Sequence, residues 1–145
     1  MYVGPRLREV LSRLNTASSI EALRSSLADA ARHMGFPYVV LFQHGGLPRL
    51  VEKALMVTNY PEKFVQSYIE DHHYIIDPIC EVSEQLDRPF TWDEIPNFVK
   101  LTGKQIAMFE KAREYGIAHG VTVPLHIPSE SYASTAHRSC PIAGR

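Results

Sequence analysis

The chain has 145 residues, of which 45% are hydrophobic and 21% are charged, and its formal net charge is −1. This length fits one domain with a buried core, and the composition excludes a largely disordered chain. Because 15 basic residues are balanced by 16 acidic residues, no sequence-wide field attracts the chain to a phosphate backbone. DNA binding by this chain alone is therefore not expected.

Signals for a membrane, a secretory route or a cofactor are not found in the sequence. No apolar run approaches the roughly 18 residues of a membrane span, and the N-terminus lacks the apolar segment of a secretory signal. We therefore expect a cytoplasmic protein without membrane contact. No glycine motif for phosphates or dinucleotides occurs, so no cofactor is expected. Cys80 and Cys140 are predicted to be free thiols.

Two amphipathic helices are predicted at the start of the chain. Leucines and a valine at helical spacing from Leu7 to Leu14 predict the first helix, which should end near residues 15–16. Ser18-x-x-Glu21 has the form of a capping box for the second helix, and Gly35 is its expected stop. Both helices should cover one face of a sheet.

The next segments predict a hairpin followed by helices. Residues 38–42 are β-branched and aromatic, a Gly-Gly pair interrupts the pattern, and an extended pattern resumes over residues 50–57. Asn59 is expected to cap a helix over about residues 61–71, and a short helix should follow Asp77-Pro78. The first of these helices should point four side chains inward, namely Phe64, Val65, Tyr68 and Ile69.

A further helix and a strand are predicted near the end of the patterned sequence. Thr102-x-x-Gln105 opens a helical pattern that includes Ile106, Phe109 and Ala112 and ends at residues 115–116. Residues 121–126 then form a strand. This order of elements indicates an α+β fold with a predominantly antiparallel sheet and helices lying on it.

Aromatic residues and one aspartate suggest a small-molecule pocket. Tyr60, Phe64 and Tyr68 are four residues apart, which places them on one face of a helix, and Asp77 and Trp92 arrive from later segments. Such a set can line a pocket with aromatic walls and one carboxylate. Two alternatives stay open: the aromatic residues can form a core stripe, and Asp77 can be a turn or N-cap residue before a proline.

Several phrases of the sequence carry a family resemblance. They are Asn59-Tyr60-Pro61, the spacing from Tyr68 to Asp77-Pro78, Phe90-x-Trp92, and the phrase Gly-Ile-x-x-Gly-Val-Thr-Val-Pro over residues 116–124. Together they closely resemble the autoinducer-binding domain of LuxR-family quorum-sensing regulators. The resemblance implies an α/β/α sandwich around a five-stranded antiparallel sheet, a signal receptor rather than an enzyme, and a dimer.

The resemblance also implies a ligand, an N-acyl-homoserine lactone, and roles for the pocket residues. Asp77 would accept a hydrogen bond from the amide N–H, Tyr60 and Tyr68 would lie near the acyl carbonyl, and Trp92 would cover the lactone ring. The remaining implied wall residues are Ile69, Ile79, Phe90, Ala112 and Ile117, with Val39 and Leu41 as further candidates.

Position 64 departs from the family pattern. The family typically has a tryptophan there, whose indole N–H donates to the lactone carbonyl, whereas Phe64 has no donor. Loss of one hydrogen bond costs about 0.5–1.5 kcal/mol, and more if the carbonyl stays buried and unpaired, so affinity for an ordinary lactone could fall about tenfold or more. The predicted ligand is therefore an N-acyl-homoserine lactone or a related acylated signal.

The end of the chain also departs from the family. Residues 129–145 are rich in Ser, Ala, His and Arg and lack alternation, whereas the family has a last apolar strand. We predict an autoinducer-binding domain over residues 1–128 and an atypical, truncated or altered tail over residues 129–145. A DNA-binding helix-turn-helix module would need about 60 further residues of patterned helix, and we expect this chain to lack one. This leaves open a second function, in which the chain forms heterodimers with a full-length LuxR-type regulator and inhibits it.

Catalysis and metal binding are weaker hypotheses. Asp77 and Tyr68 could act as the acid and base of a lactone hydrolase, but nothing in the sequence supplies an activated water. Seven histidines are present, including His72-His73 after Asp71, and a second possible pair is His119 with His126. Adjacent histidines on a helix point about 100° apart and cannot readily share one ion. We therefore predict neither a catalytic residue nor a metal site.

Overall fold

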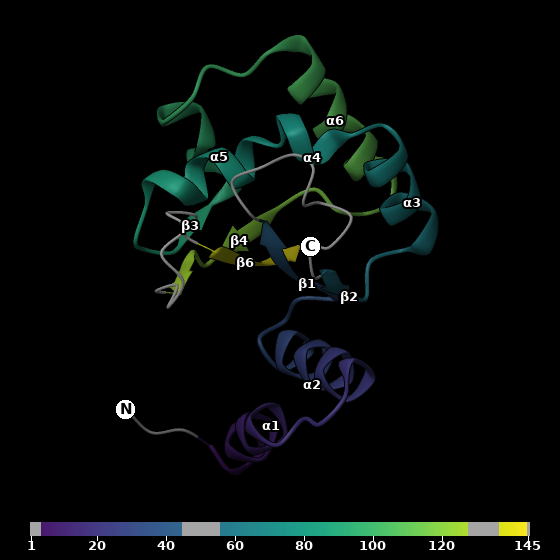
Figure 1. Cartoon of the computed structure of the whole chain (residues 1–145), viewed down its shortest axis with the longest axis vertical. Helices are drawn as coiled ribbons and strands as arrows, with labels where there is room; N and C mark the ends of the chain where they lie inside the picture. The colour runs from purple at the N-terminus through teal and green to yellow at the C-terminus, as the bar shows by residue number, and fades with distance from the viewer. Residues whose placement is uncertain (1–3, 45–55, 128–136, 145) are drawn as a thin grey trace.

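The structure is a computed structural model that describes residues 4–44, 56–127 and 137–144. It has three layers, with a sheet between two helices on one side and four helices on the other (Figure 1). This confirms the predicted α+β class and the α/β/α sandwich. The elements in chain order are α1 (Pro5–Asn15), α2 (Ile20–His33), β1 (Tyr38–His44), β2 (Met56–Thr58), α3 (Glu62–Glu70), α4 (His73–Ile76), α5 (Pro78–Gln85), β3 (Phe90–Thr91), the 3₁₀-helix η2 (Trp92–Asn97), α6 (Gly103–Glu114), β4 (Gly120–Thr122), β5 (Leu125–Ile127) and β6 (His137–Gly144).

The sheet is antiparallel throughout the described residues, in the order β2-β1-β6-β4-β3, with β5 also paired to β6. Strand β6 lies at the centre, where Ile142 is opposite both Val40 of β1 and Thr122 of β4. The last strand, which the tail sequence left doubtful, is present as β6. Backbone groups make the sheet ladder, so a strand does not require the side-chain alternation that the tail lacks. The division of the chain at residue 128 stays a prediction.

The layer formed by α1 and α2 differs from its prediction in two details. Ser19 caps α2, since its hydroxyl accepts a hydrogen bond from the N–H of Ala22 at 3.1 Å, so the predicted capping box at Ser18 was one residue too early. Gly35 ends the helix as expected, with φ of 86°. Helix α2 contacts the sheet, whereas α1 buries none of its residues and packs on α2 (Figure 1).

The side chain of Asn59 forms hydrogen bonds to the backbone at the start of the hairpin and does not cap α3. Its side-chain oxygen accepts a hydrogen bond from the N–H of Val39 at 2.7 Å, and its amide donates to the carbonyl of Pro37 at 3.0 Å. Pro61 occupies the N-cap position of α3. The predicted hairpin is confirmed where β1 pairs with β2, while residues 50–55 lie outside the described residues.

The later elements follow the sequence closely. The capping box of α6 forms as predicted: the N–H of Thr102 donates to Gln105 Oε1 at 2.9 Å, and the N–H of Gln105 donates to Thr102 Oγ1 at 3.3 Å. Gly116 ends the helix with φ of 80°. The strand predicted over residues 121–126 is divided into β4 and β5. Pro124 lies between them and has no N–H for a ladder hydrogen bond.

Buried side chains form two clusters on the two faces of the sheet. On the α2 side, Ala28 and Ala31 pack against Val39 of β1. On the other side, a larger and strongly aromatic cluster fills the space between the sheet and the helices α3 to α6. This second cluster holds the candidate site.

Candidate functional site

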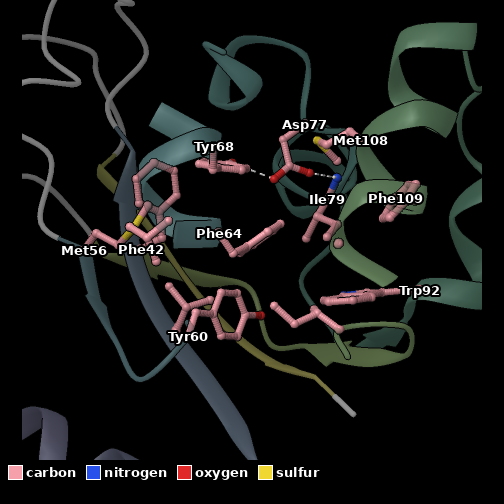
Figure 2. A pocket seen from close by; sticks show the side chains of 14 residues that line it. Phe42, Met56, Tyr60, Phe64, Tyr68, Asp77, Ile79, Trp92, Met108 and Phe109 are labelled. Carbon is pink, nitrogen blue, oxygen red and sulfur yellow. Dashed lines mark hydrogen bonds between the residues drawn. The ribbon is translucent and has the colours of Figure 1, made fainter. Parts of the chain in front are cut away.

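A cavity lies inside the aromatic cluster, between the sheet and α3, α5 and α6 (Figure 2). The cavity has a volume of about 50 Å³. Its walls are apolar and aromatic except for one carboxylate and the hydroxyls of two tyrosines. The residues lining it are Val40, Phe42, Met56, Tyr60, Phe64, Val65, Tyr68, Asp77, Ile79, Trp92, Met108, Phe109, Ala112 and Ile117.

Asp77 is the acidic residue of this lining, and only 6% of its surface is exposed. Its Oδ1 accepts a hydrogen bond from the N–H of Ile79 at 2.8 Å, and its Oδ2 accepts one from the hydroxyl of Tyr68 at 2.7 Å (Figure 2). Burial raises the pKa of Asp77 above its ordinary value, and these bonds, with one from the N–H of Cys80, oppose that rise. Asp77 is thus both the N-cap of α5 and a cavity residue, so the two interpretations from sequence are compatible.

The three aromatic residues of α3 and the preceding loop lie side by side as their spacing predicts. The ring centroid of Phe64 is 5.7 Å from that of Tyr60, 6.3 Å from that of Tyr68 and 5.5 Å from that of Tyr115. Phe64 is therefore held at the middle of an aromatic cluster and also faces the cavity (Figure 2). The core-stripe interpretation and the pocket interpretation again describe the same side chains.

Trp92 forms another wall of the cavity from the start of η2. Its indole Nε1 donates a hydrogen bond to Thr122 Oγ1 at 3.1 Å, and this hydroxyl is fully buried. The ring lies directly on Gly120 of β4, where an added Cβ atom would be 2.7 Å from Trp92 Cδ2 and closer still to two other ring carbons. Only glycine leaves room for this approach. The position of Trp92 is thus set by β4, and its N–H is used within the protein.

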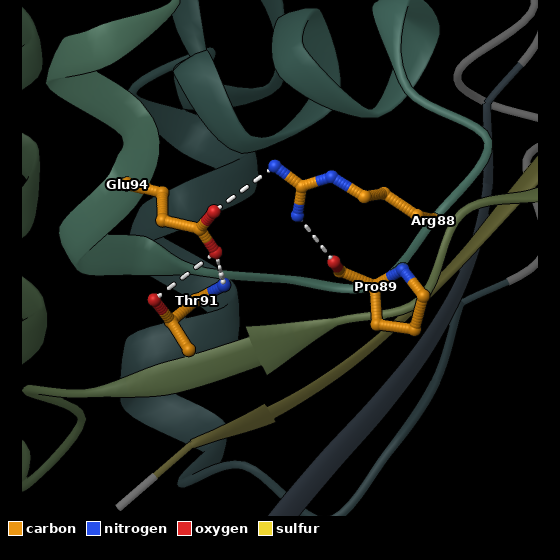
Figure 3. Close-up of polar contacts among 4 residues, drawn as sticks. All are labelled: Arg88, Pro89, Thr91 and Glu94. Carbon is orange, nitrogen blue, oxygen red and sulfur yellow. Dashed lines mark hydrogen bonds and ion pairs between the residues drawn. The ribbon is translucent and has the colours of Figure 1, made fainter.

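A polar network holds the corner that leads from β3 into η2 (Figure 3). Glu94 accepts hydrogen bonds from the N–H of Thr91 at 2.8 Å and from Arg88 Nη2 at 3.0 Å, while Arg88 Nη1 donates to the carbonyl of Pro89 at 2.9 Å. The bond from the Thr91 N–H and the one from Arg88 lower the pKa of Glu94. This corner fixes the chain immediately before Trp92. Its exposed ion pair adds little stability in itself.

Eight of the ten predicted site residues line the cavity, and two do not. Ile69 is 49% exposed, because it follows Tyr68 by one residue and a helix turns about 100° per residue. Phe90 is buried in the same cluster but does not line the cavity. The eight residues that the structure brings together are Tyr60, Phe64, Tyr68, Asp77, Ile79, Trp92, Ala112 and Ile117.

The first strand was assigned to the wrong face. Val39 and Leu41 were the candidates, but Val40 and Phe42 line the cavity and Val39 packs against α2. Side chains alternate along a strand, so an error of one residue exchanges the two faces. Ile106 was also expected in the inward helical pattern of α6 and is 46% exposed.

Six lining residues were not predicted as site residues: Val40, Phe42, Met56, Val65, Met108 and Phe109. Met108 precedes the predicted Ala112 by four residues, and this helical spacing is a signal that would have found it. Residues 38–42 of β1 are all hydrophobic or aromatic, so the sequence does not show which of them face the cavity and which face α2.

The titratable groups outside the cavity form small ion-pair groups among the described residues, such as Lys111 and His73 around Asp71. There is no group of three His, Cys, Asp or Glu residues in the described part of the chain that could hold a metal ion. Lys111 Nζ donates to Asp71 Oδ2 at 2.8 Å and lowers the pKa of Asp71. The side chains of His126 and Cys140 lie outside the described side chains.

A known protein family matches most of this chain. The family model of the autoinducer binding domain matches residues 19–140, and the chain therefore belongs to this family, the ligand-sensing domain of LuxR-type quorum-sensing regulators. The transcriptional activator protein TraR of Agrobacterium vitis is 28% identical over 127 residues, which are 83% of this chain and 51% of TraR. The chain spans about half the length of the curated relatives it matches.

Solved structures show the same fold. CepR2 of Burkholderia cenocepacia, an N-acylhomoserine lactone dependent LuxR family transcription factor, aligns with a TM-score of 0.72 at 22% identity over 95% of this chain and 75% of CepR2. Escherichia coli SdiA in complex with octanoyl-rac-glycerol aligns with a TM-score of 0.70 at 21% identity over 99% of this chain and 56% of SdiA. Within the described residues, no helix is long and apolar enough to cross a membrane.

Proposed function

We propose that this chain senses an acylated signal, an N-acyl-homoserine lactone or a related compound, as the ligand-binding domain of a LuxR-type transcriptional regulator. The observation that carries this proposal is Asp77, a buried carboxylate in an otherwise aromatic and apolar cavity. Burial of a carboxylate costs free energy, and a protein retains one where it has a structural or binding role.

Asp77 is suited to accept a hydrogen bond from an amide N–H of the ligand. Each carboxylate oxygen has more than one lone pair, so the bonds from Tyr68 and Ile79 leave acceptor capacity. A carboxyl group retains acceptor capacity whether it is ionised or protonated. The hydroxyl of Tyr60 is the donor proposed for an acyl carbonyl, since the hydroxyl of Tyr68 already donates to Asp77. The apolar walls accept the acyl chain.

Neither Phe64 nor Trp92 has an N–H available to donate a hydrogen bond to the head group of the ligand. Phe64 has no donor, and the N–H of Trp92 is bonded to Thr122. A lactone carbonyl would therefore have to find another partner or stay unpaired, which costs about 1–3 kcal/mol if it is buried. Acylated compounds without a lactone ring belong in the same ligand class, and SdiA in complex with octanoyl-rac-glycerol supports their inclusion.

The cavity is expected to enlarge when ligand binds. Ligand pockets typically measure about 300–1,000 Å³, whereas this cavity measures about 50 Å³, so a signal with a long acyl chain would require the walls to repack. Met56 and Met108 line the cavity, and methionine adapts to such changes because its side chain is unbranched and flexible. The bound signal would then become part of the core.

The test is to express the protein with and without a panel of acylated compounds and to identify the retained ligand by mass spectrometry. The panel contains N-acyl-homoserine lactones of several chain lengths, the matching acyl amides without the ring, and acylglycerols. A bound ligand at 100 times its dissociation constant adds about 2.7 kcal/mol to stability, which raises the melting temperature by several degrees. An unchanged melting temperature for every compound, with no ligand extracted, would contradict the proposal.

The partners and the chemistry of the domain are part of the same proposal. We expect the domain to act in the cytoplasm, as a homodimer or as a heterodimer with a LuxR-type regulator, and to bind its ligand without converting it. Light scattering during gel filtration, alone and with such a regulator, measures the assembly. A ring-opening assay with the retained lactone would contradict the binding role if it detected turnover.

A further inference from the structure

Asp77 lies at a single-residue junction between two short helices. It is the C-cap of α4 and the N-cap of α5, so the peptide bond between Ile76 and Asp77 determines where its carboxylate points. The last carbonyls of a helix have no partner within that helix. The carbonyl of Ile76 therefore needs a donor from elsewhere.

Gln105 of α6 supplies that donor. Its Nε2 donates to the carbonyl of Ile76 at 2.9 Å, across 29 residues of sequence, and the side chain is buried. Its Oε1 accepts a hydrogen bond from the N–H of Thr102 at 2.9 Å. One amide thus connects the start of α6 to the peptide bond that carries Asp77.

The connector before Asp77 is also attached to α6 at its other end. Lys111 bonds to Asp71 at 2.8 Å, so α6 holds residues 71–76 at both ends. The two attachments differ in how far they are exposed to water. The side chains of Lys111 and Asp71 are 37% and 48% exposed, and an ion pair exposed to this degree contributes little. The bond from the buried side chain of Gln105 is better protected from water, and it is the one that can fix the peptide bond.

We infer that Gln105 is a positioning residue for the binding site, because it holds the peptide bond before Asp77 and so aims the carboxylate into the cavity. This inference rests on the proposed function for its effect on affinity. The other supports of Asp77 act on the carboxylate itself, from Tyr68 and from the N–H groups of Ile79 and Cys80. Gln105 acts on its backbone from a third helix.

Three variants separate positioning from helix stability. Gln105→Glu keeps the acceptor for the N–H of Thr102 and removes the donor to Ile76, and Gln105→Met removes the donor without adding charge. The control is Thr102→Ala, which removes the other half of the capping box and leaves the bond from Gln105 to Ile76 in place. Thr102→Ala and Gln105→Met weaken the start of α6, whereas Gln105→Glu keeps the capping box. Only the two Gln105 variants release the peptide bond.

The readouts are the dissociation constant for the retained acylated ligand and, without ligand, the amide resonance of Ile79, which reports its bond to Asp77. We expect about tenfold weaker binding and a shifted Ile79 resonance for both Gln105 variants, with little change in either for Thr102→Ala. Unchanged affinity and resonance in the Gln105 variants would overturn the inference. If the parent binds no compound of the panel, the proposed function fails, and the Ile79 resonance still decides whether Gln105 positions Asp77.

Discussion

On one face of the sheet, Ala28 and Ala31 of α2 pack against Val39, whereas on the other face large aromatic side chains surround a cavity and a buried carboxylate. The small side chains of the first face bring α2 close to the sheet. The large rings of the second face surround a cavity, and a binding site can form there. Along β1 these two roles alternate from one residue to the next.

This difference indicates how the domain separates stability from binding. Changes on the α2 face should alter the free energy of unfolding without altering ligand affinity, and changes on the cavity face should alter both. The following predictions test that separation, from the largest expected effect to the smallest.

Gly120→Ala should have the largest effect, because the new Cβ atom would overlap the ring of Trp92. Overpacking of a core typically costs about 1–3 kcal/mol, and the displaced indole would also lose its bond to Thr122. We expect a lower free energy of unfolding in urea and weaker ligand binding. Gly103→Ala is the matched control, since no atom lies within 4 Å of a Cβ at that position. Equal stability of the two variants would show that Trp92 does not depend on Gly120.

Val39→Ala and Val40→Ala form the most direct test of the comparison. Both valines are buried, at 6% and 4% exposure, and they face opposite sides of the sheet. Each change should lower the free energy of unfolding by about 1–3 kcal/mol. Only Val40→Ala enlarges the cavity, so only this variant should change the preference among acyl-chain lengths. A changed preference in Val39→Ala would contradict the separation of the two faces.

Phe64→Trp should sharpen the definition of the ligand. The larger ring costs about 1–3 kcal/mol if the surrounding rings cannot move, whereas its N–H offers about 0.5–1.5 kcal/mol to a lactone carbonyl. We expect tighter binding of a lactone and no gain for the matching acyl amide without the ring, as measured by titration calorimetry. Equal losses for both compounds would show that the cavity is shaped around phenylalanine.

The pH dependence of stability should differ between the parent and Asp77→Asn. The pKa of Asp77 is raised in the folded state, so its contribution is fully present below the ordinary value near 3.8 and is lost as the pH rises through the folded pKa. The free energy of unfolding of the ligand-free parent, minus that of Asp77→Asn, should therefore fall as the pH rises above about 4. Urea unfolding at several pH values measures it, and a rising difference would mean that the hydrogen bonds outweigh burial.

Features that depend on local chemistry could be predicted from the sequence. The capping box at Thr102 and Gln105 and the end of α6 at Gly116 follow from hydrogen bonds within a few residues, and both are confirmed. The family resemblance placed Asp77 and Tyr68 in the same pocket, and the structure joins them by a hydrogen bond. These signals do not depend on how the sheet packs.

Features that depend on tertiary packing could not be predicted. The apolar run of β1 has no alternation, so only the docking of α2 decides that Val39 faces away from the cavity. The central place of β6 depends on backbone pairing with β1 and β4, to which the polar tail sequence gives no clue. The bond from Gln105 to Ile76 joins residues 29 positions apart, and a sequence pattern does not show such a contact.

The most direct test of the central claim is the dissociation constant of the retained ligand for the parent and for Asp77→Asn. Asparagine keeps the size and the cap for the N–H of Ile79, but it places an NH₂ group where an acceptor oxygen was, which costs about 1–3 kcal/mol. We predict that Asp77→Asn folds with at least the stability of the ligand-free parent at neutral pH and binds about tenfold or more weakly. Equal affinity of the two proteins would contradict the account and leave Asp77 as a helix cap alone.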